Sequence, residues 1–427
     1  MRALCLLALA GCSRLVEPDP GLLPPPDQGT VEEHLGPGGF DPCPSIQVDP
    51  PVALSASALG TGNPRVGWNH DTRRFVAIWR DEGSFVYRFL DAGGRAVGLE
   101  GTLRGLDGSP VVGDPAVVGV GGLAKAGFYV TIQTAGRVEV ARLFADGTAS
   151  REDAVLWGAL DSAAPSIAWD GDRLAIGYAL DSGESRLVSY EKLGDDALDC
   201  GGPGGGGPDD HCADDGTIQG AEPAVGWLDR RWLMAVNAEA SLGWIALEPA
   251  AEDDGTARVE TIEIALDELA AGSSARLAST ERRLAVALRT MEGLRVWQIS
   301  SLVAGGEDVQ CILEASALSE GTPAVVWGHG RRVAVAGLWP RPNGGRHVVL
   351  ARADAPTLSD TSRPAATGCD GLELEIDPVQ VSEGVDVIAR DPDLVFSGSS
   401  YGIVWAQHGI DDDDSSDVYF ALARCAP

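Results

Sequence analysis

The chain has few positive charges and lacks any long apolar run. It carries 32 Lys and Arg residues against 63 Asp and Glu, which gives a formal net charge of −31. A surface of this sign repels phosphate backbones and bare anionic membranes, so nucleic-acid binding is not expected. No stretch of eighteen apolar residues occurs, so no membrane-spanning helix is expected either. Cys-x-x-Cys pairs and closely spaced His pairs are also missing, and no metal or other cofactor is predicted.

A repeated segment is the main feature that the sequence does have. The clearest copies, at 64–68, 165–169, 223–227 and 323–327, begin with Pro and then alternate aliphatic with small or aromatic residues. Weaker copies begin at Pro115, Ala275 and Pro392, and successive copies are 51, 50, 58, 52, 48 and 69 residues apart. A period near fifty with four short strands per unit is typical of a β-propeller blade. The sequence therefore predicts an all-β, seven-bladed β-propeller of four-stranded antiparallel blades.

The last repeat is one strand short. It offers three strands, at 392–396, 401–407 and 417–424, before the chain ends at Pro427. Residues 45–54 precede the first repeat and resemble the outer strand expected at 372–381 of the sixth. Because an unclosed ring would leave an exposed sheet edge, we expect the N-terminal strand to complete the last blade and close the propeller.

The first twelve residues have the features of an export signal. One positive charge is followed by a short apolar run and by Leu9-Ala10-Gly11-Cys12. This segment resembles a bacterial lipoprotein signal with its lipobox, which implies cleavage before Cys12 and acylation of its thiol. A short secretory signal with a chance Cys is the alternative. Ser13, rather than Asp, follows the Cys, and in lipoproteins of two-membraned bacteria this resembles an outer-membrane address.

The segment between the signal and the first strand is rich in Pro, Asp, Glu and Gly. Such a composition buries too little apolar surface to fold and is typical of a semi-extended tether. The predicted organisation is a signal peptide at 1–11, a lipid-anchored tether at 12–42 and a β-propeller at 43–427. The expected location is the bacterial outer membrane or cell surface, with membrane contact through the lipid anchor only.

Six cysteines remain once Cys5 and the lipidated cysteine are set aside. They are Cys43, Cys200, Cys212, Cys311, Cys369 and Cys425. An even count in an exported chain indicates disulfides, although six cysteines allow fifteen pairings. The predicted topology favours Cys43 with Cys425, at adjoining ends of neighbouring strands. It also favours Cys200 with Cys212, across a Gly-rich loop, and leaves Cys311 to pair with Cys369.

Catalytic residues are not evident in the sequence. Propeller enzymes place carboxylates, His or Arg on the inner strands around the central channel, and the inner strands expected here offer only Arg65, Arg276 and Asp393. The G-x-S-x-G match at 398–402 leads from a turn into a strand rather than a helix, so it does not fit a nucleophile elbow. No catalytic residue is predicted, and an enzyme is the less favoured class.

An acidic run near the C-terminus is a weak metal candidate. Asp411, Asp413 and Asp417 alternate as the ligands of a calcium loop do. Position six of that loop is Ser416 instead of Gly, and position twelve is Leu422 instead of Glu. A hairpin tip in water is the favoured interpretation.

One repeat also resembles a known family. The run 165–176, PSIAWDGDRLAI, is similar to the repeat of bacterial extracellular propeller lipoproteins, which often reads Pro-Ala-Val-Ala-x-Asp-Gly-x-x-Tyr-Leu-Val-Val-Trp. The resemblance spans roughly 44–427 and implies the fold more than a function. Two hypotheses stay open: a non-catalytic, surface-tethered binding or scaffold protein with a protein or glycan ligand, and a propeller-type hydrolase or lyase acting on extracellular glycans. Carboxylates that converge at the channel mouth would favour the enzyme.

Overall fold

The structure, a computed structural model of the chain, consists of β-strands joined by turns wherever it is described. No helix occurs among these residues, and hence none that could cross a membrane. The described residues are 45–55, 62–105, 107–121, 127–159, 164–171, 173–190, 215–238, 241–248, 258–262, 274–280, 282–300, 309–328, 330–355, 378–411 and 416–426.

Antiparallel sheets of four strands follow one another along the chain. The first sheet contains β3 (Gly62–Asn69), β4 (Arg74–Asp81), β5 (Ser84–Asp91) and β6 (Ala96–Leu103). The second contains β7 (Ala116–Val120), β8 (Gly127–Thr134), β9 (Arg137–Phe144) and β10 (Ala149–Trp157). The third contains β11 (Ser166–Trp169), β12 (Leu174–Ala179), β13 (Glu184–Tyr190) and β14 (Asp215–Gln219). The fourth contains β15 (Ala221–Leu228), β16 (Arg231–Ala238), β17 (Ser241–Glu248) and β18 (Arg258–Ile262). The fifth contains β19 (Arg276–Ser279), β20 (Leu284–Thr290), β21 (Gly293–Ile299) and β22 (Val309–Ala315).

The remaining strands form one mixed sheet of nine strands rather than two separate sheets. They are β1 (Ser45–Val48), β2 (Val52–Ala53), β23 (Glu320–Trp327), β24 (Arg332–Pro340), β25 (Arg346–Asp354), β26 (Val379–Gln380), β27 (Val387–Phe396), β28 (Ser400–Gly409) and β29 (Asp417–Ala426). A single parallel pairing, Arg346 with Ile388, joins its two halves. It forms because β27 begins several residues before the expected start at Pro392 and so reaches the first residue of β25. Of the outer strand expected at 372–381, the described part is β26.

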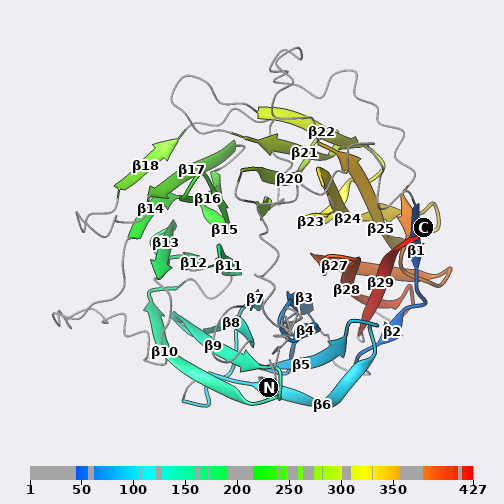
Figure 1. Cartoon of the computed structure of the whole chain (residues 1–427), viewed down its shortest axis with the longest axis horizontal. Coiled ribbons are helices and arrows are strands. Elements are labelled where there is room, and N and C mark those ends of the chain that lie inside the picture. The colour runs from blue at the N-terminus through cyan, green and yellow to red at the C-terminus, as the bar shows by residue number, and fades with distance from the viewer. Residues whose placement is uncertain are drawn as a thin grey trace, which may run out of the picture.

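The sheets are arranged in a ring, as Figure 1 shows. The first strands of successive repeats, β3, β7, β11, β15, β19, β23 and β27, contact one another in this order, and β27 returns to β3. Each sheet extends outward from its inner strand. The chain is therefore an all-β protein with the architecture of a β-propeller.

The hydrophobic core lies between neighbouring sheets. Each junction has its own cluster of buried side chains, including the junction of β23–β25 with β27–β29 and that of β28–β29 with the first sheet. The recurrent Trp of the repeat packs against the preceding sheet: Trp68 lies with Phe420, Trp227 with Leu187, and Trp327 with Ala287. The repeated motif thus supplies one half of every junction, which explains its regular return.

The N-terminal strands lie beside the last strand of the chain. β1 pairs antiparallel with β29, from Ser45 opposite Ala426 to Val48 opposite Ala423, and β2 pairs with β29 further along. The Asp49 carboxylate adds an ion pair of 2.7 Å to Nε of Arg424. In Figure 1 the blue N-terminal strands accordingly lie against the red C-terminal one.

Candidate functional site

Two cavities occupy the centre of the ring, and Arg65 and Arg276 line both. The larger, of about 250 Å³, lies along the inner strands and extends to His70 and Phe396. The smaller, of about 180 Å³, lies at the end of the channel where the inner strands begin. Side chains from β3, β19 and β27 reach both cavities, so residues more than 300 positions apart in sequence share one site.

The smaller cavity is lined by one equivalent residue from every repeat. These are the residues directly before the first residue of each copy: Asn63, Asp114, Ala164, Glu222, Ser274, Thr322 and Asp391. Because the repeats are related by rotation around the ring, a single position in the repeat becomes a circle of side chains in space. Three of the seven are carboxylates.

Backbone irregularities turn several of these side chains into the channel. The pairing of β3, β15 and β27 with the next strand shifts register by a β-bulge at this position. Asn63, Glu222 and Asp391, each directly before a proline, have positive φ angles of 37°, 53° and 52°. A positive φ angle at a non-glycine residue strains the backbone by on the order of 1–3 kcal/mol. Bulges commonly redirect a side chain near functional sites. The repetition of the same strained geometry in three repeats indicates that the circle is a built feature.

Hydrogen bonds hold most of the carboxylates in place. Asn237 Nδ2 and Ser274 Oγ each donate to Glu222 Oε2 at 2.7 Å. The backbone N–H of Val66 donates to Asp393 Oδ2 at 2.8 Å, which ties β3 to β27.

Asp114 is held in the same way, since its Oδ2 accepts a hydrogen bond from Asn63 Nδ2. Asp114 and Glu222 therefore each use one carboxylate oxygen in a fixed side-chain contact and present the other to further donors.

Asp391 differs from the other carboxylates. Burial raises its pKa above the ordinary value, and the charge of Asp114 adds to this effect, against the opposing influence of Arg65 and Arg276. No hydrogen bond or ion pair joins its carboxylate to another residue in the described part of the chain. It is the carboxyl group of the cavity with the most freedom to meet a ligand.

The two guanidinium groups are also short of partners. Arg65 donates 3.1 Å to the carbonyl oxygen of Pro64, and within the described ranges no carboxylate lies within ion-pairing distance of Arg65 or Arg276. Burial, followed by repulsion from Arg65, lowers the pKa of Arg276 to about 10, although Asp393, Glu222 and Asp114 oppose this shift. Arg276 remains charged at neutral pH. Its guanidinium is half-buried, and no acceptor from the described residues binds its N–H donors.

The opposite end of the larger cavity is aromatic. Trp68 and His70 meet edge to face, with ring centroids 5.9 Å apart. Burial lowers the pKa of His70, partly offset by Asp71. His70 is therefore mainly neutral at physiological pH, and the charge of the channel is concentrated at the other end.

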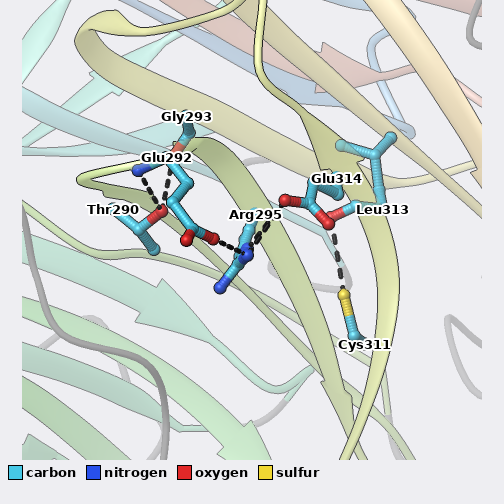
Figure 2. Close-up of polar contacts among 7 residues, drawn as sticks. All are labelled: Thr290, Glu292, Gly293, Arg295, Cys311, Leu313 and Glu314. Carbon is cyan, nitrogen blue, oxygen red and sulfur yellow. Dashed lines mark hydrogen bonds and ion pairs between the residues drawn. The ribbon is translucent and has the colours of Figure 1, made fainter. Parts of the chain in front are cut away.

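Other polar clusters have structural roles. In Figure 2, Arg295 pairs with Glu292 and, at 2.9 Å, with Glu314, which joins β21 to β22. Unlike the channel arginines, this guanidinium is satisfied by neighbouring carboxylates.

A buried Ser–His pair lies at the outer side of β25. Ser382 Oγ is 3.2 Å from His347 Nδ1 and accepts the backbone N–H of Val348 at 2.9 Å. The two side chains are only 1 % and 4 % exposed, and burial together with Arg341 lowers the pKa of His347. Since a substrate has no access to this hydroxyl, the pair fixes the loop before β27 and offers no nucleophile.

The structure brings some of the residues predicted from the sequence together and adds others that were not predicted. Arg65, Arg276 and Asp393 are brought together in the channel, as expected from their places on inner strands. The sequence analysis missed Asp114, Glu222 and Asp391, because it began each repeat one residue too late. The prediction that carboxylates are scarce at the channel was therefore wrong for this end. The signal that could have found them is the residue preceding each repeat.

The remaining predicted sites are described only in part. Cys311 lies in β22, where its Sγ is 3.7 Å from the carbonyl oxygen of Leu313, and Cys425 lies in β29 opposite Ile46. The other cysteines, Cys12, Cys43, Cys200, Cys212 and Cys369, lie outside the described residues, so the lipidation and the pairings stay predictions. Asp411 and Asp417 flank the connection from β28 to β29, and Asp413 lies outside the described residues. The G-x-S-x-G match covers the turn after β27 and the first residues of β28, so a strand follows it rather than a helix.

Comparisons with known proteins show neither a family nor a function for the chain. No protein-family model and no curated protein matches the chain. Among solved structures, the β-propeller domain of Cps50 (Swd1) from Myceliophteria thermophila is 12% identical, with 90% of this chain and all of that chain covered at a TM-score of 0.44. The PQQ-bound aldose sugar dehydrogenase of Streptomyces coelicolor is 17% identical, with 72% of this chain and 98% of that chain covered and a TM-score of 0.42. AofleA from Arthrobotrys oligospora is 10% identical, with 75% of this chain and 89% of that chain covered and a TM-score of 0.39.

Proposed function

We propose that this protein is a non-catalytic, surface-tethered β-propeller that binds a small polar ligand at the charged end of its central channel. The observation that carries this proposal is the cavity formed by Arg65, Arg276 and Asp391, in which charged groups lie half-buried without close partners among the described residues. Charged groups removed from water are costly unless they are paired, so such a cavity favours a ligand that completes them.

The scaffold in this proposal has seven blades. The five separate sheets supply five, and the single parallel pairing between Arg346 and Ile388 divides the nine-stranded sheet into β23–β26 and β27–β29 with β1. The separate hydrophobic cluster between these halves supports the division. In the seventh blade the N-terminal strand β1 takes the outer position, so the ring closes by pairing the two ends of the chain. A rigid closed ring fixes the geometry of the channel.

The proposed attachment to the cell surface rests on the sequence. Acylation of Cys12 would anchor the chain at the outer membrane, with residues 12–42 as a tether. One saturated chain anchors only marginally, so stable attachment requires more than one acyl group. Because the chain is strongly acidic, the lipid would be its only contact with the membrane.

A glycan hydrolase or lyase is the second candidate, and one observation favours it. Asp391 has a raised pKa beside the carboxylate of Asp114, and acid catalysis of glycoside cleavage uses a carboxylic acid of raised pKa with a second carboxylate. Binding is preferred because Asp114 and Glu222 are each fixed by side-chain donors and the cavity, at about 180 Å³, is small for a polysaccharide.

A ligand screen on the full chain tests the proposal. Melting temperatures are measured with sugars, amino acids, carboxylic acids and amines, for the wild type, for Arg65→Gln/Arg276→Gln and for the control Arg332→Gln, whose Arg pairs with exposed Asp354. We expect compounds that raise the melting temperature of the wild type and of the control but not of the channel variant. If no class of compound does so, the binding proposal is wrong. New reducing ends released from a glycan, but not by Asp391→Asn, would instead establish the enzyme.

A further inference from the structure

We propose that the channel ligand is a small zwitterion that carries a carboxylate and an ammonium group on one carbon, as an α-amino acid does. The inference deepens the proposed function and rests on it. It follows from the juxtaposition of two guanidinium groups, Arg65 and Arg276, with the carboxylates of Asp391, Asp114 and Glu222 in one cavity.

The two arginines provide a site for the carboxylate. The guanidinium of Arg276 makes no hydrogen bond or ion pair with any described residue, and Arg65 uses one N–H on its neighbour Pro64. A guanidinium presents a planar fork of donors that matches both oxygens of a carboxylate. Burial is the largest cause of the lowered pKa of Arg276, and the charge of Arg65 lowers it further, because the two guanidinium groups repel each other. An anion bound between them would relieve that repulsion.

The acidic residues provide a site for the ammonium group. Asp114 and Glu222 each have one oxygen occupied by a protein donor, which orients the carboxylate and leaves the second oxygen for the ligand. Asp391 offers a carboxylate with no hydrogen bond to any described residue. An ammonium group has three donors, and three converging carboxylates can accept them.

The balance of charge decides between ligand classes. With Asp393, four carboxylates face two guanidinium groups, so a simple anion meets an excess of negative charge. A simple cation meets both guanidinium groups at the same short range, and a neutral sugar leaves all of the charges uncompensated. A zwitterion places each charge against its opposite, and the small volume at this end of the channel excludes a polymer.

The test compares ligands that differ by one charged group. Binding to the full chain is measured by calorimetry for L-alanine, for propionate, which lacks the ammonium group, for ethylamine, which lacks the carboxylate, and for D-glucose. We expect L-alanine to bind at least about tenfold more tightly than any of the other three, since each lacks a charge-assisted contact.

Two variants assign the two halves of the site. Arg276→Gln should remove the preference for L-alanine over ethylamine, because the carboxylate loses its partner. Asp391→Asn should reduce the preference over propionate, because the ammonium group loses one of its acceptors. Arg332→Gln, outside the channel, should change neither preference. Thermal melts establish whether each variant is folded. If a variant is not folded, the affinities of the wild type for the four ligands test the proposal by themselves.

The outcomes separate this inference from the proposed function. Equal binding of L-alanine and propionate, or of L-alanine and ethylamine, overturns the zwitterion. Binding of D-glucose that depends on Arg276, without binding of L-alanine, also overturns it but leaves a channel-binding protein. Failure of every compound in the wider screen overturns both.

Discussion

Leu54 is the residue through which the closure of the ring can be tested most directly. It follows β2 and is only 2 % exposed, in the cluster between the first sheet and β28–β29. Its N–H donates to the Val418 carbonyl oxygen in β29 at 2.7 Å, and its own carbonyl oxygen accepts from Arg88 of β5 at 3.1 Å. Leu54 thus binds the N-terminal segment to both sides of one junction.

The expected cost of Leu54→Ala follows from this burial. Truncating a fully buried Leu to Ala costs about 2–5 kcal/mol, as lost transfer free energy plus the energy of the cavity. An unfolding entropy near 2.1 cal/mol/K per residue corresponds to roughly 0.8 kcal/mol/K for a body of this size, so the Tm should fall by about 3–6 °C. Val52→Ala is the matched control, because Val52 is 42 % exposed and its loss should cost less than about 0.5 kcal/mol.

The assay is equilibrium unfolding in urea combined with calorimetry of both variants. Equal, small changes for Leu54→Ala and Val52→Ala would refute the reasoning, because the N-terminal segment would then add nothing to the junction. A loss limited to Leu54→Ala supports closure of the ring through this segment.

Four further predictions follow from particular residues. In Gly119→Ala the added Cβ would lie 1.7 Å from a backbone carbonyl oxygen of the preceding sheet. Urea unfolding should therefore show that the free energy of unfolding falls by about 1–3 kcal/mol or more. Unchanged stability would mean that the sheets separate easily. Folding raises the pKa of Asp391 above its value of 3.8 in the unfolded chain, so ionisation of Asp391 lowers the stability of the wild type as the pH rises above 3.8. Asp391→Asn should therefore be more stable than the wild type at pH 7, with a smaller difference at pH 3.5. A difference in stability that is independent of pH would contradict this. Cys12→Ala should abolish labelling of the protein by a fatty-acid probe in cells, and equal labelling of both proteins would exclude the lipid anchor at this position. Non-reducing peptide mapping should find Cys43 joined to Cys425, a bond that stabilises by as much as about 6 kcal/mol because the loop is nearly the whole chain; a different partner for Cys43 would contradict this pairing.

The repeat could be recognised in the sequence because the same positions of each copy pack at the junctions between sheets. A Trp at a fixed place in the four clearest copies packs against the preceding sheet, and the alternation of side chains along the inner strand follows from the two faces of a strand. The period near fifty then predicted the four-stranded sheets in order. The last three strands, at 392–396, 401–407 and 417–424, are confirmed within β27, β28 and β29. The link between β25 and β27 was not predicted, since a single pairing depends on where two strands end.

The charged end of the channel shows the limit of sequence reasoning most clearly. Asp114, Glu222 and Asp391 precede prolines, and sequence alone places such residues in turns, where they would meet water. The bulges that turn Glu222 and Asp391 inward result from pairing with the next strand, and the closeness of all three carboxylates results from the rotation of each sheet around one axis.

The sequence by itself determined the all-β character, the period of the repeat, the residues that fill each junction and the acidic charge of the chain. These properties are local or additive, so composition and alternation are enough to establish them. Only the tertiary structure decided which polar residues share a cavity, and that Arg276, unlike the paired Arg295, lies there without a close partner in the described part of the chain. The ring brings together residues hundreds of positions apart, and the charge that each one meets depends on all of the others.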